Sequence, residues 1–172
     1  RIARNLDRLE ELIGEVLTLS RLDTVTYTRE RFDLAELASA IVRDCQLEAS
    51  AKSCTLHTDI TPELVIEGSP ELLRRAVENV LRNAIKFSQE ETEVSIVAEK
   101  QGDHISIRVN DQGSGIPEES KDSVFEAFIR IDQARQHKPG GYGLGLAIAK
   151  KAIELHGGTI AAENRQEGGL SV

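Results

Sequence analysis

Two asparagines and a lysine are spaced so that they could bind a charged ligand together. Asn79, Asn83 and Lys86 stand at i, i+4 and i+7, so a helix with about 3.6 residues per turn would place them on one stripe. Apolar residues fill the neighbouring arc, which lets the helix pack on a core while the stripe faces a ligand. Amide oxygens and an ammonium group suit a Mg²⁺-bound polyphosphate. For this helix alone, a polar stripe that faces water is the commoner explanation.

Three glycine clusters that follow this helix favour the nucleotide interpretation. They occupy residues 111–117, 140–146 and 168–169, with the sequences DQGSGIP, GGYGLGL and GG. Glycine permits positive φ and close backbone approach, which a loop that wraps a nucleotide needs. The second cluster precedes a predicted helix, whose N-terminal N–H groups would favour phosphate. A dinucleotide-binding motif or a P-loop does not fit, because position 146 is leucine and no Gly-Lys-Ser/Thr occurs.

The order of these segments resembles the sequence boxes of two-component sensor histidine kinases. The asparagine helix, residues 111–115, residues 125–130 and residues 141–145 correspond to the N, first glycine, F and second glycine boxes. The resemblance extends over almost the whole chain from about Glu30. Within this family, the chain resembles the envelope-stress sensor kinases of Gram-negative bacteria. It implies the Bergerat ATP-binding fold, an α/β sandwich (α+β) with a mixed, mainly antiparallel sheet covered by three helices.

The resemblance also implies a role for each candidate site residue. Asp111 would accept a hydrogen bond from the adenine amino group, while the catalytic residues Lys86 and Arg130 would neutralise charge on the transferred phosphoryl group. Asn83, with Asn79 nearby, would hold Mg²⁺. The other expected ATP contacts are Phe87, Gly113, Gly115, Ile116, Gly141, Tyr142, Gly143, Leu144 and Gly145. Plainer alternatives are a turn-forming role for Asp111 and a core position for Phe87.

The residue four positions before Asn83 bears on the reaction. ATP-hydrolysing relatives, such as DNA gyrase, place there a glutamate that can activate water, whereas this chain has Asn79. An amide is no general base, so water attack should be slow and the γ-phosphate kept for a protein acceptor. We therefore expect a protein-histidine kinase domain that uses ATP and Mg²⁺. The alternatives are an ATP hydrolase of the same superfamily and a non-catalytic nucleotide-sensing or protein-binding module.

The beginning of the chain has the pattern of one helix of a bundle. Apolar residues recur there at spacings of three and four, at Ile2, Leu6, Leu9, Ile13, Val16 and Leu17. By resemblance, residues 1–23 are the second helix of a dimerisation and phosphoacceptor hairpin. Residues 24–31 would be a linker, and residues 32–172 the catalytic domain with a truncated C-terminal strand. The expected partners are this hairpin, of the same or a partner subunit, a response regulator, and a second copy in a homodimer.

None of the four histidines has the sequence context of the family's phosphoacceptor. They are His57, His104, His137 and His156. The last of them precedes two glycines and is expected to end a helix, where a histidine favours the helix dipole. The acceptor histidine is therefore expected on a hairpin helix that this sequence does not contain.

Hydrophobic periodicity and turn residues predict the elements that position the site. Helices are predicted over about residues 33–52, 70–88, 118–128 and 146–156, and strands over 55–60, 64–67, 92–100, 104–110, 159–163 and 169–172. Asp33 and Ser69 are expected to cap two helices, with Pro70 in the first turn of the second. The polar stretch 129–141 is predicted to be an ATP lid that is mobile without nucleotide.

Composition limits the possible functions. The 172-residue chain has a net charge of −8 and only 3% aromatic residues, which argues against nucleic-acid binding. Cys45 and Cys54 lack metal-site spacing and are expected to be buried thiols in a reducing cytosol. No run of 18 apolar residues and no signal peptide is found. We therefore expect a soluble fragment, the cytoplasmic portion of a bacterial inner-membrane sensor kinase, with the anchor implied by the family alone.

Overall fold

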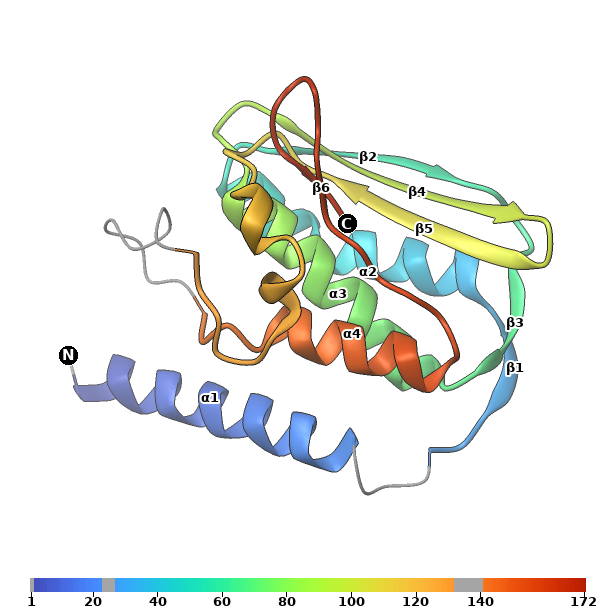
Figure 1. Ribbon diagram of the computed structural model, residues 1–172, viewed down its shortest axis with the longest axis horizontal. Coiled ribbons are helices and arrows are strands. Elements are labelled where there is room, and N and C mark those ends of the chain that lie inside the picture. The colour runs from blue at the N-terminus through green and yellow to red at the C-terminus, as the bar shows by residue number, and fades with distance from the viewer. Residues whose placement is uncertain (1, 23–26, 132–140) are drawn as a thin grey trace.

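The computed structural model describes residues 2–22, 27–131 and 141–172, and its main feature is a five-stranded sheet with helices on one side (Figure 1). The strand order is β2-β4-β5-β7-β6. The β2–β4 pair is parallel and the other three pairs are antiparallel. The strands are β2 (Thr55–Ile60), β4 (Glu93–Gln101), β5 (His104–Asn110), β6 (Glu163–Asn164) and β7 (Leu170–Ser171). The predicted mixed, mainly antiparallel sheet is thus confirmed.

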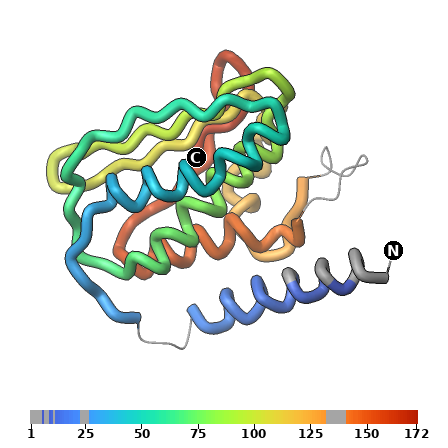
Figure 2. The backbone as a smooth tube through the Cα atoms, turned by 180° about the vertical axis from the view of Figure 1, so that it is seen from behind, coloured from blue at the N-terminus to red at the C-terminus, as the bar shows by residue number. Residues whose placement is uncertain are grey.

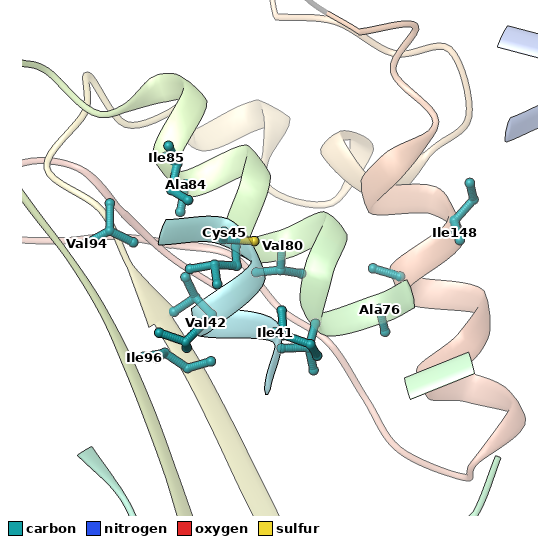
Figure 3. Packing of buried hydrophobic residues seen from close by; sticks show 14 of the residues in the cluster. Ile41, Val42, Cys45, Ala76, Val80, Ala84, Ile85, Val94, Ile96 and Ile148 are labelled. Atoms are coloured by element: carbon teal, nitrogen blue, oxygen red, sulfur yellow. The ribbon is translucent and has the colours of Figure 1, made fainter. Parts of the chain in front are cut away.

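Three helices, α2 (Leu34–Ala51), α3 (Pro70–Phe87) and α4 (Gly145–Leu155), lie on the same side of this sheet. Their inward side chains meet those of β4 in one core, which Figure 3 shows from close by. The largest fully buried side chains are Ile41, Leu81, Ile96, Leu144, Val94 and Cys45. Because α3 packs against both α2 and α4, it forms the centre of the helical layer.

The predicted helix signals agree with the observed boundaries. The Asp33 carboxylate accepts a hydrogen bond from the Ala35 N–H at 2.8 Å, and α2 begins at the next residue. The Ser69 hydroxyl accepts from the Leu72 N–H at 3.4 Å, and Pro70 is the first residue of α3. Both caps act locally, which explains why they could be predicted.

His156 ends α4 and joins it to the start of α3. Its Nε2 atom accepts a hydrogen bond from the Ser69 N–H at 2.9 Å, while Nδ1 lies 2.7 Å from the Ala152 carbonyl oxygen. Gly157 follows with a φ of 74°, as in a glycine helix C-cap. The predicted helix-terminal position of His156 is confirmed, and both of its ring nitrogens have partners.

A second, two-stranded sheet contains the first correction to the predicted elements. β1 (Glu30–Asp33) pairs antiparallel with β3 (Val65–Gly68), so residues 30 and 31 are strand although the sequence placed them in the linker. Four residues are too few to show a clear alternation, and this strand depends on a partner more than thirty residues away.

Two further predicted elements were wrong in type or extent. Residues 118–128 form two short 3₁₀ turns, η1 (Glu118–Ser120) and η2 (Ser123–Phe125), in place of a helix. Phe128 has a φ of 67°, which no right-handed helix allows, and its N–H donates to the Gly143 carbonyl oxygen at 2.9 Å. Of the predicted strand 159–163, only Glu163 is a strand residue, and it forms β6 together with Asn164, which pairs with β7.

Helix α1 (Ile2–Leu22) runs beside α4, as Figures 1 and 2 both show. Leu22, at its end, is buried in the main core. In contrast, α1 exposes the large apolar residues Leu6, Leu9, Ile13, Val16 and Leu17. Within the described part of the chain, no helix is long and apolar enough to cross a membrane.

Replacing Ser69 with alanine should lower the free energy of unfolding by about 1 kcal/mol, because the first turn of α3 loses its N-cap acceptor. Urea denaturation of both proteins would measure this difference. Ser106→Ala is the matched control, since Ser106 lies on the face of β5 that the helices leave open. Equal stability of Ser69→Ala and the unsubstituted chain would contradict the capping assignment.

Candidate functional site

The polar stripe of α3 lies next to the second glycine segment. Asn79 and Asn83 are half-buried and Lys86 is exposed, at the edge of the buried face of α3. A Cβ atom built on Gly145 would lie 3.4 Å from Asn79 Oδ1, and one built on Gly141 would lie 3.7 Å from Lys86 Nζ. The fold therefore brings together residues that are more than fifty positions apart in the sequence.

Asp111 follows β5 and is only 5% exposed. Its Oδ1 atom accepts two backbone hydrogen bonds, from the Gly113 N–H at 2.8 Å and the Leu170 N–H at 3.1 Å. Within the described residues, Oδ2 has no hydrogen-bond partner. Burial raises the pKa of the Asp111 carboxyl, and the two N–H donors and the Arg165 charge oppose this shift. One carboxylate oxygen is thus used by the fold, and the other is left for a ligand.

Gly113 lets the loop after β5 pass against the end of α3. A Cβ atom at this position would lie 2.5 Å from the Phe87 carbonyl oxygen, a contact that no other residue could make without a backbone shift. The loop therefore places Asp111 beside the last turn of α3. The side chain of Phe87 is 42% exposed, so the alternative that it is a core residue is wrong. Lys86 Nζ lies 5.0 Å from its ring centroid.

Asn164, on β6, holds the first glycine segment and was missed by the sequence reasoning. Its Oδ1 atom accepts from the Ile116 N–H at 2.8 Å, and its Nδ2 atom donates to the Ile116 carbonyl oxygen at 2.6 Å. Gly115 has a φ of 68°, and a Cβ atom there would lie 2.5 Å from Asn164 Oδ1. Asn164 is 48 residues from Ile116 on a very short strand, so no local pattern could have indicated the contact.

The end of the chain supports Asp111 from behind. Arg165 Nη1 donates to the Asp111 carbonyl oxygen at 2.6 Å, and the Asp111 N–H donates to the Leu170 carbonyl oxygen at 2.9 Å. Gly169 has a φ of 91°, and a Cβ atom on it would overlap the Asp111 carbonyl group. This explains the third glycine cluster of the sequence: it lets β7 approach the first glycine segment.

The F box and the second glycine box are joined through the backbone. Phe125 is buried, whereas Phe128 is 61% exposed and Arg130 is also exposed. A Cβ atom on Gly143, whose φ is 76°, would lie 2.6 Å from the Ile129 carbonyl oxygen. Tyr142 is half-buried. The lid predicted over residues 129–141 lies mostly outside the described residues, as does His137, so its mobility remains a prediction.

The three histidines that the structure describes lie outside the site. His57 and His104 are exposed on β2 and β5, and His156 has its structural role at the end of α4. Cys45 and Cys54 are buried free thiols, as expected. In the described ranges, no three His, Cys, Asp or Glu residues form a group that could hold a metal ion.

Comparison with known proteins agrees with this geometry. Residues 68–172 match the family described as histidine kinase-, DNA gyrase B-, and HSP90-like ATPase. The chain is 38% identical to the sensor protein VanS of Enterococcus faecium over 161 aligned residues, and this alignment covers 91% of the chain and 41% of VanS. It is 34% identical over 172 residues to the sensor histidine kinase CpxA of Escherichia coli K12, covering 99% of this chain and 37% of CpxA.

Solved structures show the same likeness. The mycobacterial sensor histidine kinase MprB superposes with a TM-score of 0.74 at 30% identity, over 84% of this chain and 93% of MprB. The catalytic domain of the histidine kinase ThkA, in a nucleotide-free form, also gives a TM-score of 0.74, at 27% identity over 84% of this chain and 91% of that domain.

The chain spans about two fifths of the length of VanS and of CpxA, and its matched residues include α3, both glycine boxes and the C-terminal strands. It belongs to the family of histidine kinase-, DNA gyrase B- and HSP90-like ATPases, as the ATP-binding catalytic domain of a sensor histidine kinase.

Proposed function

We propose that the chain binds Mg²⁺-ATP and directs its γ-phosphate to a histidine on a dimerisation hairpin, from which a response-regulator aspartate later takes it. One observation carries this proposal: the buried Asp111 carboxylate keeps one oxygen without a partner in the described residues, next to the exposed Phe87 and Lys86. A carboxylate so placed accepts a hydrogen bond from an exocyclic amine, and an exposed aromatic ring offers a surface for a base.

The phosphates are proposed to extend from this base site along the stripe of α3. Lys86 Nζ lies 5.0 Å from the centroid of the Phe87 ring and 3.7 Å from the position of a Cβ atom built on Gly141, so a phosphate beside the second glycine box would lie close to its charge. The N-terminus of α4, which follows Gly143 and Leu144, presents backbone N–H groups that favour anions. Arg130, exposed beside the second glycine box, would add a second cation.

Mg²⁺ fits the donor set of this stripe. The side chains offered by α3 are neutral amides, Asn83 and one turn earlier Asn79, and Mg²⁺ accepts such oxygens while phosphates and water supply the other ligands. Mg²⁺ would neutralise phosphate charge. Asn83 would orient the triphosphate, whereas Asn79 is partly engaged by its packing against Gly145.

Transfer to histidine, in preference to water, is supported by what surrounds Asn79. Its neighbour Glu78 forms an ion pair with Arg82 at 3.0 Å, and Arg82 also pairs with Glu48. A carboxylate held by a guanidinium is not placed to take a proton from water. In the proposed reaction, an imidazole nitrogen bonds to the γ-phosphorus as the bond to the bridging oxygen breaks. ADP leaves with the electron pair, and the imidazole proton passes to solvent.

The exposed apolar residues of α1 support the proposed partner. A helix that exposes Leu6, Leu9, Ile13 and Leu17 on one stripe needs another helix to cover them. We propose that α1 is the second helix of the dimerisation hairpin and that a homodimer covers this stripe in the full protein. The full protein would then be a membrane sensor with this domain in the cytoplasm.

The affinity for an ATP analogue should fall as the pH falls through the raised pKa of Asp111. Because Oδ1 accepts two N–H groups, the added proton goes to Oδ2, which then no longer accepts the adenine amine, and the raised pKa places this loss above the pH range of an ordinary aspartate. Calorimetric titration at a series of pH values would measure it. Mg²⁺-tripolyphosphate is the control, because it shares phosphate protonation but has no base. Parallel pH profiles for the two ligands would contradict the assignment.

Phosphoryl transfer tests the proposal itself. With γ-labelled ATP, this chain should label a separately supplied dimerisation hairpin that carries its histidine, and should leave the same hairpin unlabelled when that histidine is replaced by glutamine. Phosphate release should be slower than transfer, because Asn79 is no base and its neighbour Glu78 is paired with Arg82. Release as fast as transfer would favour a hydrolase. Binding of ATP with neither reaction would favour a nucleotide-sensing module.

A further inference from the structure

The ammonium group of Lys52 lies at the C-terminal end of α3. It donates to the carbonyl oxygens of Ser88 at 2.7 Å, Lys86 at 2.8 Å and Ile85 at 3.4 Å. Carbonyls in the last turn of a helix have no partner within the helix, and a cation there also interacts favourably with the helix dipole. One side chain from another element therefore holds the turn that carries Lys86 and Phe87.

Lys52 is itself held firmly in place. It is the C-cap of α2, and its N–H donates to the Ala49 carbonyl oxygen at 3.0 Å. Ser53 follows with a φ of 56°, and the Cys54 N–H returns to the Ala49 carbonyl oxygen at 2.9 Å. The chain reverses tightly at this point between α2 and β2. A cation on such a turn can fix the position of the carbonyl groups that it binds.

The same turn also fixes the segment that leaves α3. The Ser53 carbonyl oxygen accepts from the Glu91 N–H at 3.0 Å, and Cys54 Sγ donates to the Gln89 carbonyl oxygen at 3.3 Å. The Thr55 N–H donates to the Thr92 carbonyl oxygen at 3.0 Å. Together with Lys52, these contacts hold residues 85–92 from one side.

The candidate site lies on the other side of this segment. Gly113 packs against the Phe87 carbonyl oxygen, and the Gly113 N–H donates to Asp111 Oδ1. Lys52 and the first glycine box therefore enclose the last turn of α3 between them. A shift of this turn would move the Lys86 and Phe87 side chains and the loop that orients Asp111.

We propose that Lys52 is a positioning residue of the nucleotide site, acting through the C-terminal turn of α3. The inference rests on the proposed function, since it assigns Lys52 to the same site. Without the cation, the carbonyl groups of Ile85, Lys86 and Ser88 lose this hydrogen-bond donor. The turn would then no longer keep Lys86 and Phe87 at a fixed distance from Asp111. A purely structural cap would affect stability and leave the site geometry unchanged.

The test compares loss of the cap at each end of α3 in the 172-residue chain. Lys52→Met removes the C-terminal cap and Ser69→Ala removes the N-terminal one, which lies at the opposite end of the helix. Lys52→Arg keeps a cation at the same place. For each protein, the affinity for a non-hydrolysable ATP analogue with Mg²⁺ is measured by calorimetry at a temperature where circular dichroism shows it folded. The amide resonance of Gly113 is recorded by ¹H–¹⁵N NMR without nucleotide.

We expect Lys52→Met to weaken binding roughly tenfold, the low end of what residues supporting a binding site contribute, and to shift the Gly113 resonance. Lys52→Arg should stay near the unsubstituted chain, and Ser69→Ala should change neither readout. Lys52→Met with an unchanged affinity, or with an unshifted Gly113 resonance, would overturn the inference. If Lys52→Met does not fold, Lys52→Gln takes its place with the same two outcomes.

The proposed function and this inference can fail separately. If the unsubstituted chain binds no ATP analogue, the proposed function is wrong. The Gly113 resonance still decides whether Lys52 fixes the loop geometry, because it is measured without nucleotide. If the unsubstituted chain binds the ATP analogue and every Lys52 variant binds it with the same affinity, only the inference is wrong.

Discussion

One oxygen of one buried carboxylate joins the parts of the chain that build the site. Asp111 Oδ1 accepts N–H groups from Gly113, in the loop after β5, and from Leu170, in the last strand. Burying a carboxylate is costly unless hydrogen bonds compensate, so these two donors define where the loop and β7 lie. The glycines at 113 and 169 follow from this constraint, because a side chain at either position would collide with Phe87 or Asp111 backbone atoms. The remaining oxygen is what a ligand meets.

The other wall of the site is the last turn of α3, which is held from outside the helix. Ser69 caps the start of α3 through a residue next to it, whereas the end depends on Lys52, 34 residues earlier than Lys86. Lys86 and Phe87 thus stand on a turn fixed on one side by a cation and on the other by Gly113.

Features with local causes were predictable from the sequence, and features that depend on distant partners were not. The asparagine stripe of α3, its serine cap and the glycines that need positive φ or close approach all have short-range signatures. Asn164 and Lys52 lack such signatures, because each acts on backbone atoms more than thirty residues away. The short strand β1 depends likewise on β3, and the expected helix over 118–128 fails where Phe128 adopts a positive φ.

The affinity ratio for ATP and GTP analogues, in the unsubstituted chain and in Asp111→Asn, tests the account most directly. Adenine presents an amine donor to the free Asp111 oxygen, whereas guanine presents an acceptor there, so the unsubstituted chain should prefer adenine by roughly tenfold or more. In Asp111→Asn, the Gly113 and Leu170 N–H groups would donate to the amide oxygen, so the NH₂ group would point toward the base. The preference should then vanish or reverse. Equal affinities in the unsubstituted chain, or a preference that Asp111→Asn leaves intact, would contradict the account.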